Sequence, residues 1–331
     1  MVRSLILVLS SVLAASCDPN LDAGQNESGT KLSVDRHNPV ILLNDSARDN
    51  WSPEYAALFA NDHDGGPKIV GIVVTPSEYW PDPEANMGGW LEFVTAARSS
   101  GLQGIPDPIA SGGAQLVVPP DRRIESTRAN KSAGAELILQ KSKELALPGQ
   151  PLVVLCGTQL TDIADAFLMD PTVVERVVVV AQLGSYALAK AAMGGPNGDL
   201  DPWADWIVVQ HFSYVQVSIS YDQDGDVVAD DLANLPKNPF GVWMSTKQAA
   251  LSKLSKSPDQ GPVLALADPN FITTVVRSAA DTSDGFNSPP GAGPPLVANG
   301  SGNNWLVTEI DGTVPRTRIW QMLSNLKATK P

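Results

Sequence analysis

The stretch that decides the fold reads Leu-Val-Val-Leu-Cys-Gly-Thr-Gln-Leu-Thr-Asp and spans residues 152–162. It joins a continuous apolar run to a short polar turn, and a helical pattern over 159–168 follows. A strand that is apolar at every position is typical of a parallel sheet covered on both faces. The stretch therefore predicts a strand–turn–helix unit of an α/β fold.

Apolar runs of the same kind occur on both sides of this unit, with helical patterns between them. We predict further strands at 40–43, 69–74, 176–181, 262–267 and 305–307, and a helix over 130–147. Another helix is predicted to begin at Ser52-Pro53-Glu54, since serine caps helices, proline suits the first position and an acid is favoured in the first turn. This alternation predicts a mostly parallel central sheet flanked by helices, a Rossmann-like open sheet.

The composition fits one large globular domain. The chain has 331 residues, of which 43% are hydrophobic and 18% charged, and its formal net charge is −13. Phosphate binding needs concentrated lysine and arginine, so this charge argues against a nucleic-acid partner. The Pro/Gly-rich stretch 288–302 is expected to be a surface loop, and the domain is expected to cover 39–331.

The N-terminus has the pattern of an export signal. Arg3 precedes an apolar run over 5–9, and small residues follow up to Cys17. The run is too short to span a bilayer, so we expect a cleaved signal peptide at 1–16. Residues 13–17 resemble a bacterial lipobox, which implies lipidation of Cys17 and a polar tether over 17–38; ordinary secretion, with Cys17 as an odd thiol, is the alternative. In both cases we expect an exported protein at the periplasmic or extracellular face. If Cys17 is lipidated, the lipid anchor would be the only contact with the membrane.

Polar residues follow the predicted strands. They occupy 44–50, 75–80 and 157–162. Ligands of open parallel sheets bind beyond the carboxyl ends of the strands, so these segments are the candidate site. The acid-rich segment 44–50, facing a Thr/Asp turn, could supply oxygen ligands to a hard cation.

Four pieces of the chain, in order, resemble the nucleoside hydrolase family, the calcium-dependent N-ribohydrolases, which include inosine/uridine-preferring enzymes. They are Pro39–Asn50, Val73-Val74-Thr75, the stretch 155–181 and the stretch 261–271. The resemblance implies a calcium-held water whose proton an aspartate removes, and attack of the resulting hydroxide on the anomeric carbon of a ribonucleoside.

Carried over residue by residue, the resemblance is partial. Asp45 falls on the metal-binding, water-activating aspartate, Asp49 on the first acid of a closing pair, and Thr161 on a threonine whose carbonyl binds the metal. Leu43 replaces the first aspartate of the family loop and Gly261 the aspartate of the last piece. The second acid of the pair is either Asn50 or, in a longer loop, Glu54.

The segments that would grip the sugar also depart from the family pattern. Glu78, Asn197 and Asp205 are the candidate substrate contacts. Two functions stay open. One is a calcium-assisted N-glycosidase acting on a ribonucleoside or related ribosyl compound, with Asp45 as base and ligand and Asp49 as a supporting or sugar contact. The other is a catalytically inactive protein that binds a nucleoside or sugar and has lost the metal.

Overall fold

The computed structural model describes residues 32, 34–48, 52–62, 65–182, 196–217, 235–248, 260–267, 272–283, 285–286, 296–310, 321–323 and 326. The predicted signal peptide, Cys17, Asp49 and Asn50 lie outside these residues. Of the helices within the described ranges, none combines the length and the apolar character needed to cross a bilayer.

The described strands form one nine-stranded sheet in the order β3-β2-β1-β4-β5-β6-β9-β7-β8. Neighbouring strands run parallel from β3 to β9, and β7 is antiparallel to both β9 and β8. This confirms the predicted mostly parallel sheet. The strands are β1 (Pro39–Asn44), β2 (Lys68–Val74), β3 (Pro108–Ala110), β4 (Leu152–Cys156), β5 (Val177–Gln182), β6 (Ser213–Val217), β7 (Ile272–Ala280), β8 (Leu296–Ala298) and β9 (Asn304–Ile310).

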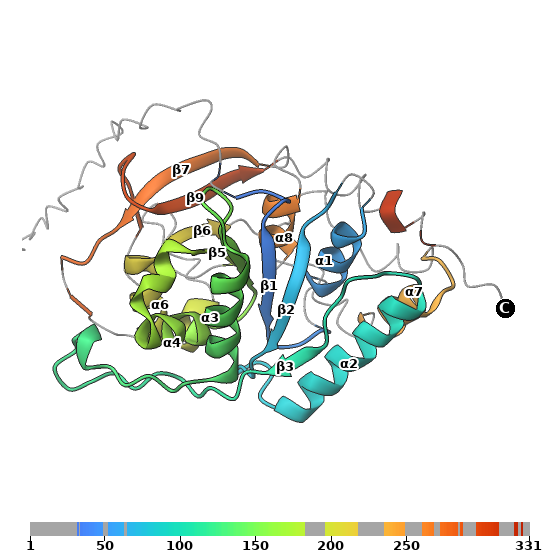
Figure 1. Cartoon of the computed structure of the whole chain (residues 1–331), viewed down its shortest axis with the longest axis horizontal. Coiled ribbons are helices and arrows are strands. Elements are labelled where there is room, and N and C mark those ends of the chain that lie inside the picture. The colour runs from blue at the N-terminus through green and yellow to red at the C-terminus, as the bar shows by residue number, and fades with distance from the viewer. Residues whose placement is uncertain are drawn as a thin grey trace, which may run out of the picture.

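Helices cover both faces of the sheet (Figure 1). They are α1 (Ser52–Ala60), α2 (Pro83–Ser99), α3 (Ala133–Leu145), α4 (Thr161–Met169), α5 (Pro196–Leu200), α6 (Pro202–His211), α7 (Pro239–Trp243) and α8 (Gln260–Ala267). Alternate side chains of each strand point to opposite faces. Val40 and Leu42 of β1 therefore pack in the cluster that includes α1, α2 and α8, whereas Ile41 and Leu43 pack in the cluster of α3, α4 and α6.

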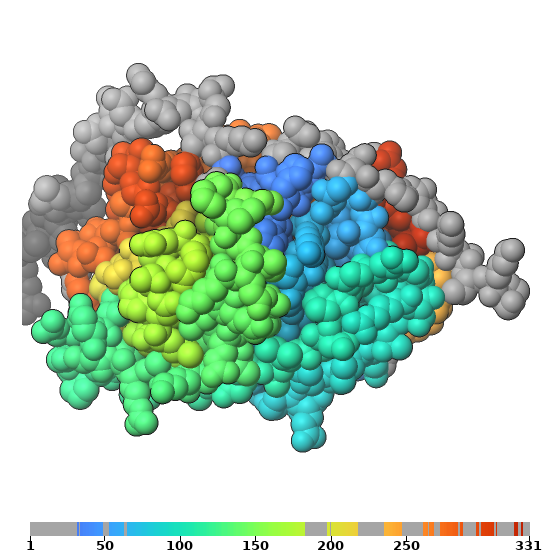
Figure 2. Space-filling model, viewed as in Figure 1, coloured from blue at the N-terminus to red at the C-terminus, as the bar shows by residue number. Residues whose placement is uncertain are grey.

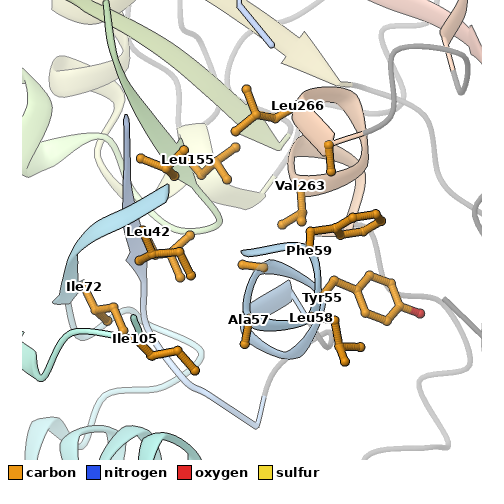
Figure 3. Close-up of a cluster of buried hydrophobic side chains, with 14 of the residues drawn as sticks. Leu42, Tyr55, Ala57, Leu58, Phe59, Ile72, Ile105, Leu155, Val263 and Leu266 are labelled. Carbon is orange, nitrogen blue, oxygen red and sulfur yellow. The ribbon is translucent and has the colours of Figure 1, made fainter. Parts of the chain in front are cut away.

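One predicted strand is wrong, because residues 262–267 belong to helix α8. A short apolar run cannot be assigned to strand or helix by periodicity when every side of it is buried. Val263 and Leu266 point into the same apolar cluster as Leu155 of β4 and Phe59 of α1 (Figure 3). The expected surface loop at 288–302 is also interrupted, since it contains the short strand β8.

The domain begins slightly before the predicted boundary at Pro39. Val34 is buried in the α1 and α2 cluster, and the Asn38 amide donates to the Pro151 carbonyl at 2.7 Å. The last residues of the predicted tether are thus part of the folded body.

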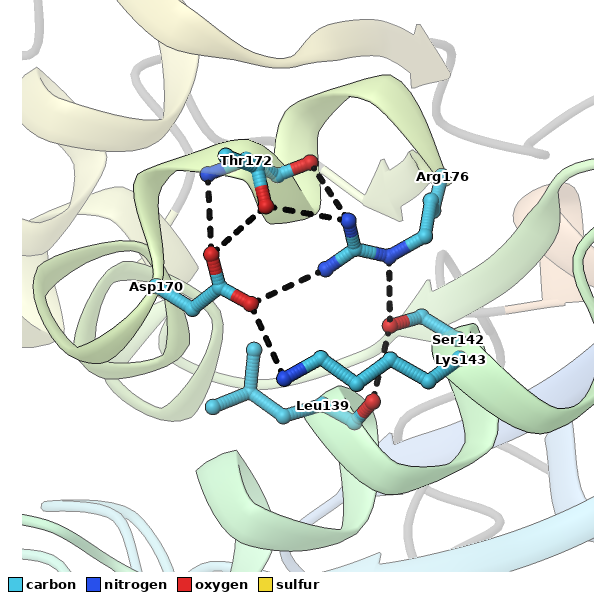
Figure 4. A network of polar contacts seen from close by, with 6 residues as sticks. All are labelled: Leu139, Ser142, Lys143, Asp170, Thr172 and Arg176. Carbon is cyan, nitrogen blue, oxygen red and sulfur yellow. Dashed lines mark hydrogen bonds and ion pairs between the residues drawn. The ribbon is translucent and has the colours of Figure 1, made fainter.

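An ion-pair network joins α3 to β5 at the amino end of the sheet (Figure 4). Asp170 caps the 3-10 helix Pro171–Glu175 and lies 3.0 Å from Lys143 Nζ and 3.1 Å from Arg176 Nη2. The hydrogen bond from the Thr172 hydroxyl, followed by the contact with Lys143, holds the pKa of Asp170 below its usual range. The network lies on the opposite edge from the strand ends described next.

Candidate functional site

The strand order reverses between β1 and β4. From β1 the chain continues outward to β2 and β3, whereas β4 lies on the other side of β1 and leads to β5 and β6. At such a reversal the connections leave in opposite directions and a crevice forms beyond the carboxyl ends. The segment 111–132, blue-green to green, runs along this edge at the bottom of the view in Figure 2.

Asp45 follows β1 directly and is buried at the crevice. Its Oδ1 accepts from the Ser46 backbone N–H at 2.7 Å, and its Oδ2 accepts from the Ser77 hydroxyl at 2.6 Å. Burial raises the pKa of Asp45 to about 6, and the hydrogen bond from Ser77 acts in the opposite direction. Ser77 follows β2 and was missed by sequence reasoning, which selected its neighbour Glu78. Glu78 is exposed.

Glu54 lies in the first turn of α1 and is fully buried. An acid at this place interacts favourably with the positive end of the helix dipole. The residues that would form the other acids of the first loop, Asp49 and Asn50, are outside the described ranges, so the choice between Asn50 and Glu54 remains a prediction.

Thr161 is the first residue of α4 and is buried beside the N-terminus of α6. Its hydroxyl donates to Asp201 Oδ2 at 2.7 Å. Asp201 caps α6 and also accepts from the Leu116 backbone N–H at 3.0 Å. Burial raises the pKa of Asp201, opposed by these hydrogen bonds. Through Asp201, hydrogen bonds connect the N-terminus of α4 at Thr161, the N-terminus of α6 and the segment 111–132 at Leu116.

Asp162 of α4 is buried and accepts hydrogen bonds from three other segments: the end of β2, the end of β3 and the start of α3. This residue was not among the candidates selected from the sequence. Its Oδ2 accepts from the Thr75 hydroxyl at 2.6 Å, and its Oδ1 accepts from the Ser111 and Ser132 hydroxyls at 2.7 Å each. Burial raises the pKa of Asp162, against the effect of the three hydroxyl donors. A Cβ at Gly134 would lie 2.6 Å from Asp162 Oδ1, so only glycine fits there.

Asp165, one turn further along α4, holds the segment before α3. It accepts from the backbone N–H groups of Asn130, Lys131 and Ser132, at 2.7, 3.2 and 2.7 Å. Lys131 has a φ of 59°, a left-handed conformation that these bonds help to fix. The crevice wall is therefore rigid at this point.

The remaining predicted substrate contacts lie in or beside α6. Asn197 in α5 is buried, and its amide donates to the carbonyl of Gln182, the last residue of β5, at 3.1 Å. Asp205 is fully buried one turn after the N-terminus of α6. Both side chains lie inside the protein body, so a direct contact of either with a sugar stays a prediction.

The calcium site that the family resemblance implies stays a prediction. Within the ranges given above, His, Cys, Asp and Glu make no cluster of three or more that could hold a metal. Calcium takes six to eight oxygen ligands. Leu43 is instead buried in an apolar cluster, and Gly261 in α8 has no side chain to offer. Asp45, with its raised pKa, can accept hydrogen bonds and take up a proton near neutral pH.

No family model matches the sequence, and no curated protein matches it either. Solved structures, by contrast, superpose over most of the chain. The inosine-uridine preferring nucleoside hydrolase from Bacillus anthracis has a TM-score of 0.59 at 14% identity, covering 87% of this chain and 98% of that one. An inosine-guanosine nucleoside hydrolase has a TM-score of 0.61 at 15% identity, covering 86% and 99%.

The purine-preferring ribonucleoside hydrolase from Gardnerella vaginalis gives a TM-score of 0.58 at 16% identity, covering 87% of this chain and 98% of that one. The sheet order, the crevice at the β1–β4 reversal and these superpositions agree. At such low identity the likeness concerns the fold, so the chain is a divergent protein of nucleoside hydrolase-like fold.

Proposed function

We propose that the chain binds a nucleoside or a related ribosyl compound at the carboxyl edge of β1, β2 and β4, and that it does so without a resident calcium ion. The observation that carries the proposal is the pairing of Asp45. Its two oxygens each accept one hydrogen bond, from the Ser46 backbone N–H and from the Ser77 hydroxyl, and each keeps a lone pair for a further donor. Such a carboxyl can hydrogen-bond a sugar hydroxyl directly.

A rigid crevice supports binding. Asp162, Asp165 and Asp201 are buried, and each accepts two or more hydrogen bonds from neighbouring segments. A preformed site loses little conformational entropy when a ligand binds. The small-molecule class is taken from the structural neighbours, whose names specify nucleosides.

A second function, hydrolysis of the N-glycosidic bond, is favoured by the pKa of Asp45. A carboxyl with a pKa of about 6 is a suitable general base near neutral pH. Asp45 would take a proton from water as the water oxygen bonds to the anomeric carbon and the bond to the base breaks. The nucleobase would leave with the electron pair of the broken bond and take up a proton from solvent.

Calorimetry with inosine and uridine, in calcium or in EDTA, combined with chromatography for free base, separates these functions. Binding that is equal in both buffers and yields no free base supports the proposal. Release of free base that is lost in Asp45→Asn would establish the hydrolase. Binding that requires calcium would overturn the metal-free proposal. No binding of either compound would remove the nucleoside class.

A further inference from the structure

A small cavity lies at the β1–β4 reversal. Asn44 and Gly157 at the ends of these strands line it, together with Pro53 of α1 and Pro262 of α8. Its volume is about 20 Å³. A cavity needs about 10–15 Å³ to hold one water molecule, so this one has room for a single oxygen atom with its hydrogens.

The side chains that line the cavity include no carboxylate. Leu43, Leu155 and Val263 line it with hydrocarbon. Leu43 and the residue before Pro262 are the two positions at which the family pattern would have carboxylates. Leu43 lines the cavity, and Gly261 directly precedes Pro262, which also lines it. Asn44 is the one lining side chain that carries an oxygen, whereas calcium takes six to eight oxygen ligands, so calcium bound there would lose most of its water ligands without replacement from the lining side chains.

Trp90 of α2 also lines the cavity, and its indole is fully buried. The Nε1–H of Trp90 has no hydrogen-bond acceptor among the described residues. A buried donor without an acceptor costs about 1–3 kcal/mol, so such groups usually meet an ordered water or a ligand. Because the indole can only donate, its partner must be an acceptor.

We propose that this cavity is a site for one neutral oxygen atom, which accepts a hydrogen bond from the Trp90 indole. The oxygen belongs either to a bound water or to a hydroxyl group of the bound ligand; the second case rests on the proposed function. In this proposal a hydrogen-bonded oxygen occupies the place at which the family pattern would hold a cation.

Nuclear magnetic resonance of the whole chain labelled with ¹⁵N-tryptophan tests this proposal. The chain has eight tryptophans, and Trp90→Phe and Trp243→Phe identify two of the indole signals. Trp243 is the matched control, since its Nε1–H is also buried and has no acceptor in the described part of the chain, yet Trp243 does not line the cavity. The indole signals are recorded without ligand, with inosine and with calcium.

A cross-peak between water and the Trp90 indole proton, absent for Trp243, supports the water case whether or not inosine binds. A change in the Trp90 signal with inosine, together with inosine affinity about threefold to tenfold weaker in Trp90→Phe and unchanged in Trp243→Phe, supports the ligand case. The proposal is overturned if Trp90 shows neither effect, or if calcium shifts the Trp90 signal of the unmodified protein. The wild-type spectra decide the matter even if a variant fails to fold.

Discussion

The buried centre at Asp162 gives the sharpest test of what holds the crevice together. Replacing Asp162 by alanine removes the acceptor of three hydroxyl donors, Thr75, Ser111 and Ser132, all of them buried. Replacing it by asparagine keeps an acceptor oxygen of the same shape and removes the charge. Comparison of the two variants separates the contribution of the hydrogen bonds to stability from the contribution of the charge.

The magnitudes follow from the contacts. Each buried donor left without an acceptor costs about 1 kcal/mol or more, so Asp162→Ala is expected to lose about 3 kcal/mol of unfolding free energy. In Asp162→Asn the oxygen can still accept from Ser111 and Ser132, and the amide can donate to the Thr75 hydroxyl after that hydroxyl rotates. Burial also disfavours the charged carboxylate, as its raised pKa shows. We therefore expect Asp162→Asn to stay within about 1 kcal/mol of the wild type.

Urea unfolding at pH 7, followed by tryptophan fluorescence and by far-ultraviolet circular dichroism, measures both variants. The slope of free energy against urea should be unchanged, because the same surface is exposed on unfolding. If Asp162→Asn lost as much stability as Asp162→Ala, the three hydroxyls would need the negative charge and not merely an acceptor. That result would refute the reasoning.

Three further predictions concern other sites. Ser77→Ala removes the 2.6 Å hydrogen bond from the Ser77 hydroxyl to Asp45, and this bond lowers the pKa of Asp45. The pKa of Asp45, measured by carbon-13 titration, should therefore rise above about 6 in the variant. An unchanged pKa would contradict the assigned contact. The pKa of Asp170 is lowered in the folded state, so its contribution of about 1 kcal/mol or less is present above the ordinary carboxyl pKa and lost as pH falls below it. Asp170→Asn should accordingly lower Tm at pH 7, and this loss should shrink progressively as pH falls below the ordinary carboxyl pKa toward the lowered pKa of the folded state. A loss of Tm that does not change with pH would exclude the ion pairs as the cause. The double variant Leu43→Asp, Gly261→Asp should have a lower Tm than the wild type in the absence of calcium. At a calcium concentration a hundred times its Kd, the unfolding free energy of this variant should rise by about 2.7 kcal/mol. The Tm of the wild type, measured by scanning calorimetry, should not change with calcium.

Much of the fold could be predicted because buried parallel strands carry their own signal. The runs in β1, β2, β4 and β5 are apolar at nearly every position, and each is followed by a polar turn. The helix α8 could not be recognised in this way. Its eight residues pack against α1 and the sheet, so an apolar run there looks the same as a strand.

The candidate site was harder to predict because its hydrogen bonds join distant segments. The hydroxyl partners of Asp162 lie 87, 51 and 30 residues away in the sequence. Nothing local marks Ser111 or Ser132 as a partner. The rule that polar residues after parallel strands meet at one edge does bring Thr75 and Asp162 together, and it applies to Ser77 as well.

The environment of Asp45 bears on the positions of Leu43 and Gly261, where the family pattern has carboxylates. A buried carboxylate that loses a neighbouring cation would retain an uncompensated charge, which costs several kcal/mol. Here the charge is met by the Ser46 N–H and the Ser77 hydroxyl, and burial moves the pKa to about 6, so the group can take up a proton. The cavity at the end of β1 is lined by no carboxylate side chain. In the proposed metal-free site, hydrogen bonds from Ser46 and Ser77 to Asp45, and from the Trp90 indole to the oxygen in the cavity, would take the place of metal coordination.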